Sequence, residues 1–112
     1  MKITTEQKRR ALVVRIDGEL DLHTSPILQE RVAAAFTEYP NLRALVVVLS
    51  NVTFIDSSGL GALLACYRDL SALGKRFVLA NPQAAVRRVL QMSGILNQID
   101  VVDSEAQAVL RL

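Results

Sequence analysis

Two consecutive serines, Ser57 and Ser58, lie between an apolar stretch and a leucine-rich stretch, with an aspartate before them and a glycine after them. The leucine-rich stretch places apolar side chains three and four residues apart, which predicts one face of a helix that begins at the serines. A helix start has unpaired backbone N–H groups and partial positive charge. It therefore favours an anion there, including a phosphate formed covalently on a serine.

The same motif has a purely structural interpretation. Asp56 caps the helix, the serines fill its first turn, and Gly59 keeps that turn compact. Taken alone, the four residues favour this cap. Gly59 and Gly61 together, however, leave the helix start with little side-chain cover, which is useful if another protein approaches the backbone.

A hydrolytic site is the third alternative. His23 is the only histidine, and with Ser57 and Asp21 it could form a nucleophile, base and orienting acid. Asp21 and His23 are only two residues apart, which leaves little room for the carboxylate to turn onto the ring. No Gly-x-Ser-x-Gly elbow surrounds Ser57, and no nucleotide-binding glycine loop occurs. We therefore predict no catalytic residue and read His23 as a loop residue near a helix cap.

The elements around the motif predict an α/β domain. Ala44–Leu49 is an unbroken apolar run, as expected of a parallel strand buried on both faces. Residues 2–7 and 11–16 read as two strands of a hairpin, followed by a helix with Ser25 as N-cap and Pro26 as its first residue. Further along, the patterns predict strands at 77–80 and 99–102, a helix from 81–82 to 93–94, and a terminal helix opened by a capping box at 104–107.

This alternation predicts a single α/β domain over residues 1–112, with a mostly parallel sheet, an antiparallel N-terminal strand or two, and about four helices. Loops that follow parallel strands gather along one edge of the sheet. We therefore expect the loops at 21–25 and 51–58 to lie together. Cys66, Met92, Val109 and Leu110 are expected to be buried.

Composition limits the remaining functions. The chain has 112 residues, 51% of them apolar, and a single cysteine, so one globular domain without disulfides or a metal site is expected, in a reducing cytoplasm. No apolar run approaches the roughly 20 residues of a membrane span, and the N-terminal segment lacks the apolar core of a signal peptide. The net charge is +2 and the cations are scattered along the sequence, which indicates solvated faces and no direct nucleic-acid binding.

Three segments together resemble one family. The segment FIDSSGLGALL, with DGELDLHT upstream and VRRVLQMSGI downstream, is similar to the STAS domain of anti-sigma-factor antagonists, from about Ile3 to Leu112. The resemblance implies a bacterial protein that binds an anti-sigma factor with serine-kinase activity and a histidine-kinase-like ATPase fold, thereby releasing a sigma factor. A serine phosphatase would reverse the modification, and the chain itself would need no cofactor.

The resemblance also assigns residues. It implies that the kinase phosphorylates Ser57 rather than Ser58, with Asp56 before it and Asp21 in the neighbouring loop. The predicted partner-binding residues are Asp21, His23, Thr24, Ser25, Asp56, Ser57, Ser58, Gly59, Leu60 and Gly61. Other STAS proteins serve as scaffold or regulatory subunits of larger assemblies, such as stressosomes or lipid-transport ABC complexes, and such a role without a phosphorylation switch is the alternative.

Overall fold

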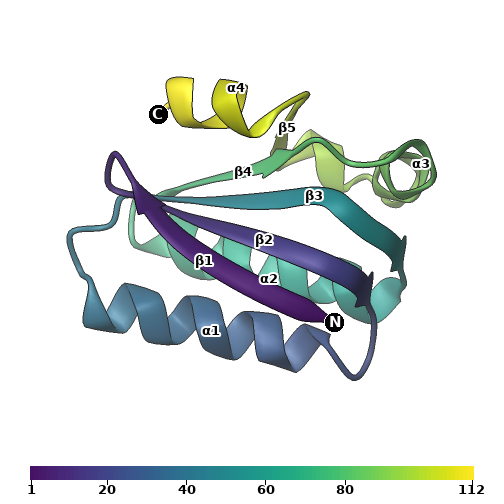
Figure 1. Ribbon diagram of the computed structural model, residues 1–112, viewed down its shortest axis with the longest axis horizontal. Helices are drawn as coiled ribbons and strands as arrows, with labels where there is room; N and C mark the ends of the chain where they lie inside the picture. The colour runs from purple at the N-terminus through teal and green to yellow at the C-terminus, as the bar shows by residue number, and fades with distance from the viewer.

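The computed structural model describes all residues, Met1–Leu112. Strands and helices alternate along most of the chain (Figure 1). The elements are β1 (Lys2–Lys8), β2 (Ala11–Leu20), α1 (Ser25–Glu38), β3 (Ala44–Ile55), α2 (Ser57–Ala72), β4 (Arg76–Ala80), α3 (Ala84–Ser93), a 3₁₀ turn (Ile95–Asn97), β5 (Asp100–Val102) and α4 (Glu105–Leu110).

The five strands form one sheet in the order β1-β2-β3-β4-β5. β1 and β2 are antiparallel, and all other neighbouring strands are parallel. The predicted α/β fold, with an antiparallel N-terminal strand and four helices, is confirmed. Helices α1 and α2 lie against one face of the sheet and α4 lies on the other (Figure 1).

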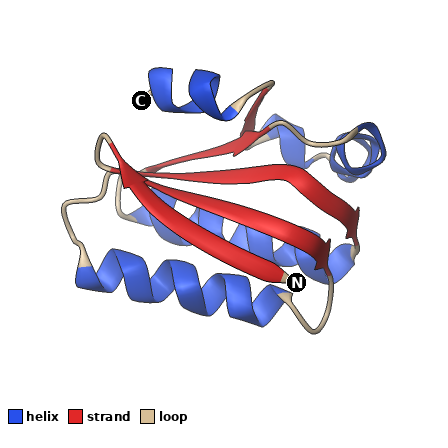
Figure 2. Cartoon of the chain, in the orientation of Figure 1, coloured by secondary structure: helices blue, strands red, loops and turns tan.

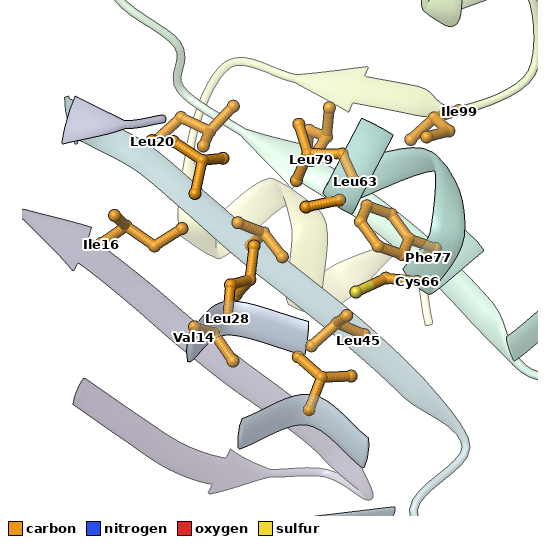
Figure 3. Packing of buried hydrophobic residues seen from close by; sticks show 14 of the residues in the cluster. Val14, Ile16, Leu20, Leu28, Leu45, Leu63, Cys66, Phe77, Leu79 and Ile99 are labelled. Atoms are coloured by element: carbon orange, nitrogen blue, oxygen red, sulfur yellow. The ribbon is translucent and has the colours of Figure 1, made fainter. Parts of the chain in front are cut away.

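β3 is buried on both faces because it is central in the sheet. Leu45, Val47 and Leu49 belong to the larger apolar cluster, which α1, α2 and α3 complete. Figure 3 shows side chains from this cluster, among them Leu45, Leu63 and Phe77. Ala44, Val46 and Val48 point to the other face, into a smaller cluster with Ala108 of α4. This two-sided burial explains why the strand reads as a continuous apolar run.

Several details differ from the sequence-based expectations. α3 begins at Ala84 with Gln83 in the N-cap position, two residues later than predicted. α1 begins at Ser25 with Thr24 in the N-cap position, one residue earlier than predicted. Met92 is 81% exposed and Leu110 is 71% exposed, so the prediction that they are buried is wrong. Met92 lies two residues beyond the buried Leu90 of α3, on another side of the helix, and Leu110 lies in the last turn of a short helix that buries only Ala108 fully. Cys66 is buried as expected.

The turn between β1 and β2 has an unusual sequence for its geometry. Lys8 pairs with Ala11, so Arg9 and Arg10 alone form the connection, and both have positive φ angles, 49° and 65°. Two-residue hairpin turns of this kind favour Asn-Gly, because a side chain with a Cβ is strained in the left-handed region. That strain is about 1–2 kcal/mol per residue, so the two arginines reduce the stability of the hairpin.

Replacing Arg9 by Asn and Arg10 by Gly should therefore stabilise the protein. After the extra flexibility of glycine in the unfolded chain is subtracted, we expect a gain of about 1 kcal/mol, or roughly 4 °C in Tm. Thermal unfolding followed by circular dichroism measures this. The matched control, Arg9→Gln with Arg10→Gln, removes the same charges but keeps both Cβ atoms. An equal Tm for the two double variants would contradict the explanation by backbone strain.

Candidate functional site

The expected loop at 51–58 is mostly strand, because β3 continues to Ile55 and only Asp56 connects it to α2. This short connection meets the 21–25 loop at one edge of the sheet, where β2 and β3 end. Leu20 pairs with Ile55 in the parallel register of these strands. The Asp56 N–H then donates to the Leu20 carbonyl at 3.3 Å. This contact places the start of α2 directly beside the loop that leads from β2 into α1, at the right of the view in Figure 1.

The start of α2 has the geometry of a capped helix with two free donors. The Asp56 side chain accepts a hydrogen bond from the Gly59 N–H at 3.0 Å, and the Asp56 carbonyl accepts one from Leu60. The N–H groups of Ser57 and Ser58 have no partner within the chain. Ser57 is exposed and Ser58 is partly buried. The structure therefore contains both the helix cap and a helix start that favours an anion. Ser57 is the more accessible of the two serines.

Asp21 and Thr24 hold the neighbouring loop through hydrogen bonds to each other. An Asp21 side-chain oxygen accepts from the backbone N–H groups of His23 and Thr24, at 3.0 Å and 3.1 Å. The Thr24 hydroxyl accepts from the Asp21 N–H and donates to the Glu19 carbonyl, both at 2.8 Å. The Thr24 N–H, followed by the Thr24 hydroxyl and the His23 N–H, lowers the pKa of the Asp21 carboxyl. Asp21 is therefore ionised at neutral pH and sets the shape of this loop.

The three residues of the hypothetical triad are not connected. The Asp21 carboxylate contacts the backbone of His23 rather than its ring. The imidazole of the exposed His23 forms no hydrogen bond, and neither does the Ser57 hydroxyl. Ser25 is buried at the start of α1 and its hydroxyl has no hydrogen-bond partner. Ser25 thus contributes almost no surface to the edge, whereas His23 contributes a free side chain.

The two glycines of α2 have different environments. A Cβ on Gly59 would lie 2.4 Å from the Leu20 carbonyl oxygen and 2.7 Å from Cγ1 of Ile55, whereas a Cβ on Gly61 would meet nothing within 4 Å. Gly59 is therefore needed for internal packing, so the interpretation that it leaves an open surface is wrong. Gly61 is exposed, so it does leave backbone surface open at the start of α2.

Exposed apolar side chains flank the two loops. One of them, Ile27, belongs to the pattern that predicted the apolar stripe of the first helix, so the prediction that it faces the core is wrong. Leu22 is 68% exposed, Phe54 is 48% exposed, and Ile27 in the first turn of α1 is 43% exposed. Strand alternation gave no signal for Phe54, because Val52 and Ile55 are both buried in the larger cluster while the two residues between them are exposed, so the alternation is broken at this end of β3. Leu22, Ile27 and Phe54 give the edge an apolar component beside a charged loop.

A shallow hollow adjoins the same edge. Its volume is about 170 Å³, and Leu60, Gly61 and Leu64 of α2 line one side of it. Ser93, Gly94, Ile95 and Gln98, which connect α3 to β5, line the other side. The downstream motif VRRVLQMSGI therefore ends beside the first turns of α2.

Comparison with known proteins identifies the fold and the motif. The family model of the STAS domain matches residues 2–108. The chain is 33% identical to the anti-sigma F factor antagonist of Paenibacillus polymyxa, over 100% of this chain and 95% of that one. This chain belongs to the STAS-domain family of anti-sigma factor antagonists.

Solved structures of family members agree with this assignment. An anti-sigma factor antagonist from Mycobacterium paratuberculosis superposes with a TM-score of 0.88 at 27% identity, covering 98% of this chain and 92% of that one. The Bacillus cell fate determinant SpoIIAA, solved in its phosphorylated form, gives a TM-score of 0.75 at 29% identity, covering 98% of each chain. Anti-sigma factor antagonists are non-enzymatic regulators.

The single cysteine is buried in the core and is not activated as a nucleophile. Burial, followed by the nearby charge of Asp69, raises the pKa of the Cys66 thiol to about 11, so this thiol stays protonated at neutral pH. No three His, Cys, Asp or Glu side chains are placed to hold a metal ion. None of the helices combines the length and apolarity that a bilayer crossing requires.

Proposed function

We propose that this chain is an anti-sigma factor antagonist whose unphosphorylated form binds an anti-sigma factor that is also a serine kinase. Binding occupies the anti-sigma factor and releases the sigma factor. The kinase then transfers the γ-phosphoryl group of ATP to the Ser57 hydroxyl oxygen, which loses its proton, and ADP leaves. The phosphorylated form no longer binds, and a serine phosphatase restores the active form.

The observation that carries this proposal is the position of Ser57. It is an exposed hydroxyl on the first residue of α2, and the two unpaired N–H groups beside it can donate to phosphate oxygens. A dianion there is also favoured by the helix dipole, typically by about 0.3–1 kcal/mol. SpoIIAA, which shares the fold along the whole chain, exists in a phosphorylated form, and this supports the same modification here.

The surface that binds the anti-sigma factor lies at the same edge of the sheet as Ser57. Leu22, Phe54 and Gly61 offer apolar and backbone surface around Ser57, and an interface core that excludes water needs such groups. Asp21 and Asp56 shape the two loops through backbone hydrogen bonds. Among the predicted partner-binding residues, the exposed ones contact the anti-sigma factor directly. The buried Ser25 and Gly59 support the shape of the two loops from inside the protein.

The proposal predicts which serine is modified. Incubation with the cognate anti-sigma kinase and ATP should phosphorylate Ser57, because this hydroxyl belongs to the exposed one of the two serines. Ser57→Ala should abolish incorporation, and the matched control Ser58→Ala should retain most of it. Phosphopeptide mapping by mass spectrometry identifies the site. Phosphate on Ser58 alone would contradict the assignment, and binding without any phosphorylation would favour an unswitched subunit of a larger assembly.

A further inference from the structure

A row of cations lies at the end of the sheet opposite Ser57. Arg10, Arg43 and Lys75 each directly precede a strand residue, and those strand residues, Ala11, Ala44 and Arg76, are aligned across β2, β3 and β4. The Arg43 N–H donates to the Arg10 carbonyl at 2.7 Å, which extends the alignment. Because neighbouring strands are about 4.8 Å apart, residues far apart in sequence become neighbours. We call Arg10, Arg43 and Lys75 the basic row.

The basic row borders a hollow of about 390 Å³. The connections that form it, β1–β2, α1–β3 and α2–β4, gather at one end of the sheet, at the left of the view in Figure 2. No carboxylate lines this hollow, although Glu38 lies with Arg10 in the adjoining one. None of the three cations forms an ion pair, whereas Lys8, Arg15, Arg87 and Arg111 all do. The hollow therefore carries uncompensated positive charge.

The row is partly held in place. The Lys75 ammonium donates to the Pro40 carbonyl at 3.2 Å and lies 5.1 Å from the centre of the Phe36 ring. One of its three N–H donors is used in this way, and two remain free. Arg10 has a strained backbone with a φ of 65°. Like charges side by side on neighbouring strands repel each other, which destabilises the sheet. Destabilising features such as this repulsion and the strained backbone of Arg10 are typical of functional sites.

We propose that this hollow binds a small ligand carrying two or more phosphate groups. Its volume falls within the usual range for small-molecule sites, about 300–1,000 Å³. The guanidinium groups offer forked donors that match phosphate oxygens, and the ammonium adds a point charge. No aromatic side chain lines the hollow, so it lacks the stacking surface that a nucleobase or single strand requires. The phosphate groups could belong either to a free small molecule or to lipid headgroups, because both present the same anionic oxygens to the cations.

Isothermal titration calorimetry with inorganic tripolyphosphate tests the site on the full chain. We expect a Kd below about 1 mM that weakens as salt rises, because the contacts are ionic. Arg43→Gln and Lys75→Gln should each weaken binding about tenfold, as the loss of a charged hydrogen-bond donor does. Arg88→Gln is the matched control: it removes one charge from an exposed position on α3 and should change Kd less than about twofold. Tm values confirm that each variant is folded.

Vesicles distinguish the two sources of phosphate. If the ligand is a lipid, the protein should sediment with vesicles that contain cardiolipin, whose headgroup carries two phosphates, but not with pure phosphatidylcholine, and Arg43→Gln should abolish sedimentation. If it is a free molecule, tripolyphosphate binds and neither vesicle does. Absence of binding to both probes would overturn the proposal. An equal loss in Arg43→Gln and Arg88→Gln would also overturn it, because it would show attraction to net charge rather than a site.

Discussion

Ser57→Asp should weaken binding to the cognate anti-sigma kinase by roughly a hundredfold, about 3 kcal/mol, while Ser57→Ala binds as tightly as the unmodified protein. The reason is the loss of water from a charged group inside the interface. Ser57 lies at the same sheet edge as the exposed Leu22, Phe54 and Gly61, so a partner packed on this edge would remove water from the new carboxylate, and the N–H groups at the start of α2 would replace only part of that hydration. The effective penalty of moving a charge out of water is several kcal/mol.

The loss should persist in 1 M salt. Screening at that concentration reduces the range of electrostatic forces to about 3 Å, so long-range repulsion disappears, but desolvation and steric blocking remain. Titration calorimetry at low and high salt measures both conditions. Ser71→Asp is the matched control, because Ser71 is also exposed on α2 but near its opposite end, and we expect a change of less than about twofold there.

Unfolding does not explain the expected loss. An acidic side chain on the first residue of a helix is favoured by the helix dipole, so Ser57→Asp should unfold at the same temperature as the unmodified protein or slightly higher. Equal affinities for Ser57→Asp and Ser57→Ala would refute a central position of Ser57 in the interface. A defect that vanished in 1 M salt would instead indicate repulsion between distant surfaces.

The sequence predicted the edge of the sheet well, because the rules that place it are local. The apolar run Ala44–Leu49 specifies a buried strand, Asp56 specifies a helix cap, and parallel strands bring their following loops together. Each step needs only neighbouring residues and a general rule of sheet topology. The convergence of the Asp21 loop and the Ser57 turn followed directly.

The basic row was not predictable in this way. Arg10, Arg43 and Lys75 are about thirty residues apart in the chain and were interpreted as scattered charges on solvated faces. They become neighbours only through the register of Ala11, Ala44 and Arg76 across three strands. Leu110 is exposed for a related reason, because the sequence does not determine how far a neighbouring sheet extends to cover the last turn of a short helix. Met92 is different, because its spacing of two residues from Leu90 already places it on another side of α3.

The role of Gly59 also depends on a tertiary contact, and it leads to the largest stability effect that we expect. Gly59 and Gly61 both occur in the first turns of α2 and are alike in the sequence. Only the structure shows that the Leu20 carbonyl lies 2.4 Å from the position of a Cβ on Gly59. This carbonyl also accepts the hydrogen bond from the Asp56 N–H. It therefore cannot move away without disturbing the junction between β2 and α2.

Gly59→Ala should consequently destabilise the protein by about 3 kcal/mol, the upper end of the usual cost of overpacking, and lower Tm by roughly 12 °C. The Ile55 side chain can shift to relieve its own contact, but a backbone oxygen cannot rotate away. Gly61→Ala, the matched control, places its Cβ in open space and should stabilise the helix by about 0.5–1 kcal/mol. Denaturant unfolding measures both. Similar free energies of unfolding for the two variants would show that the junction between β2 and α2 yields to the added methyl group, which would contradict the packing role assigned to Gly59.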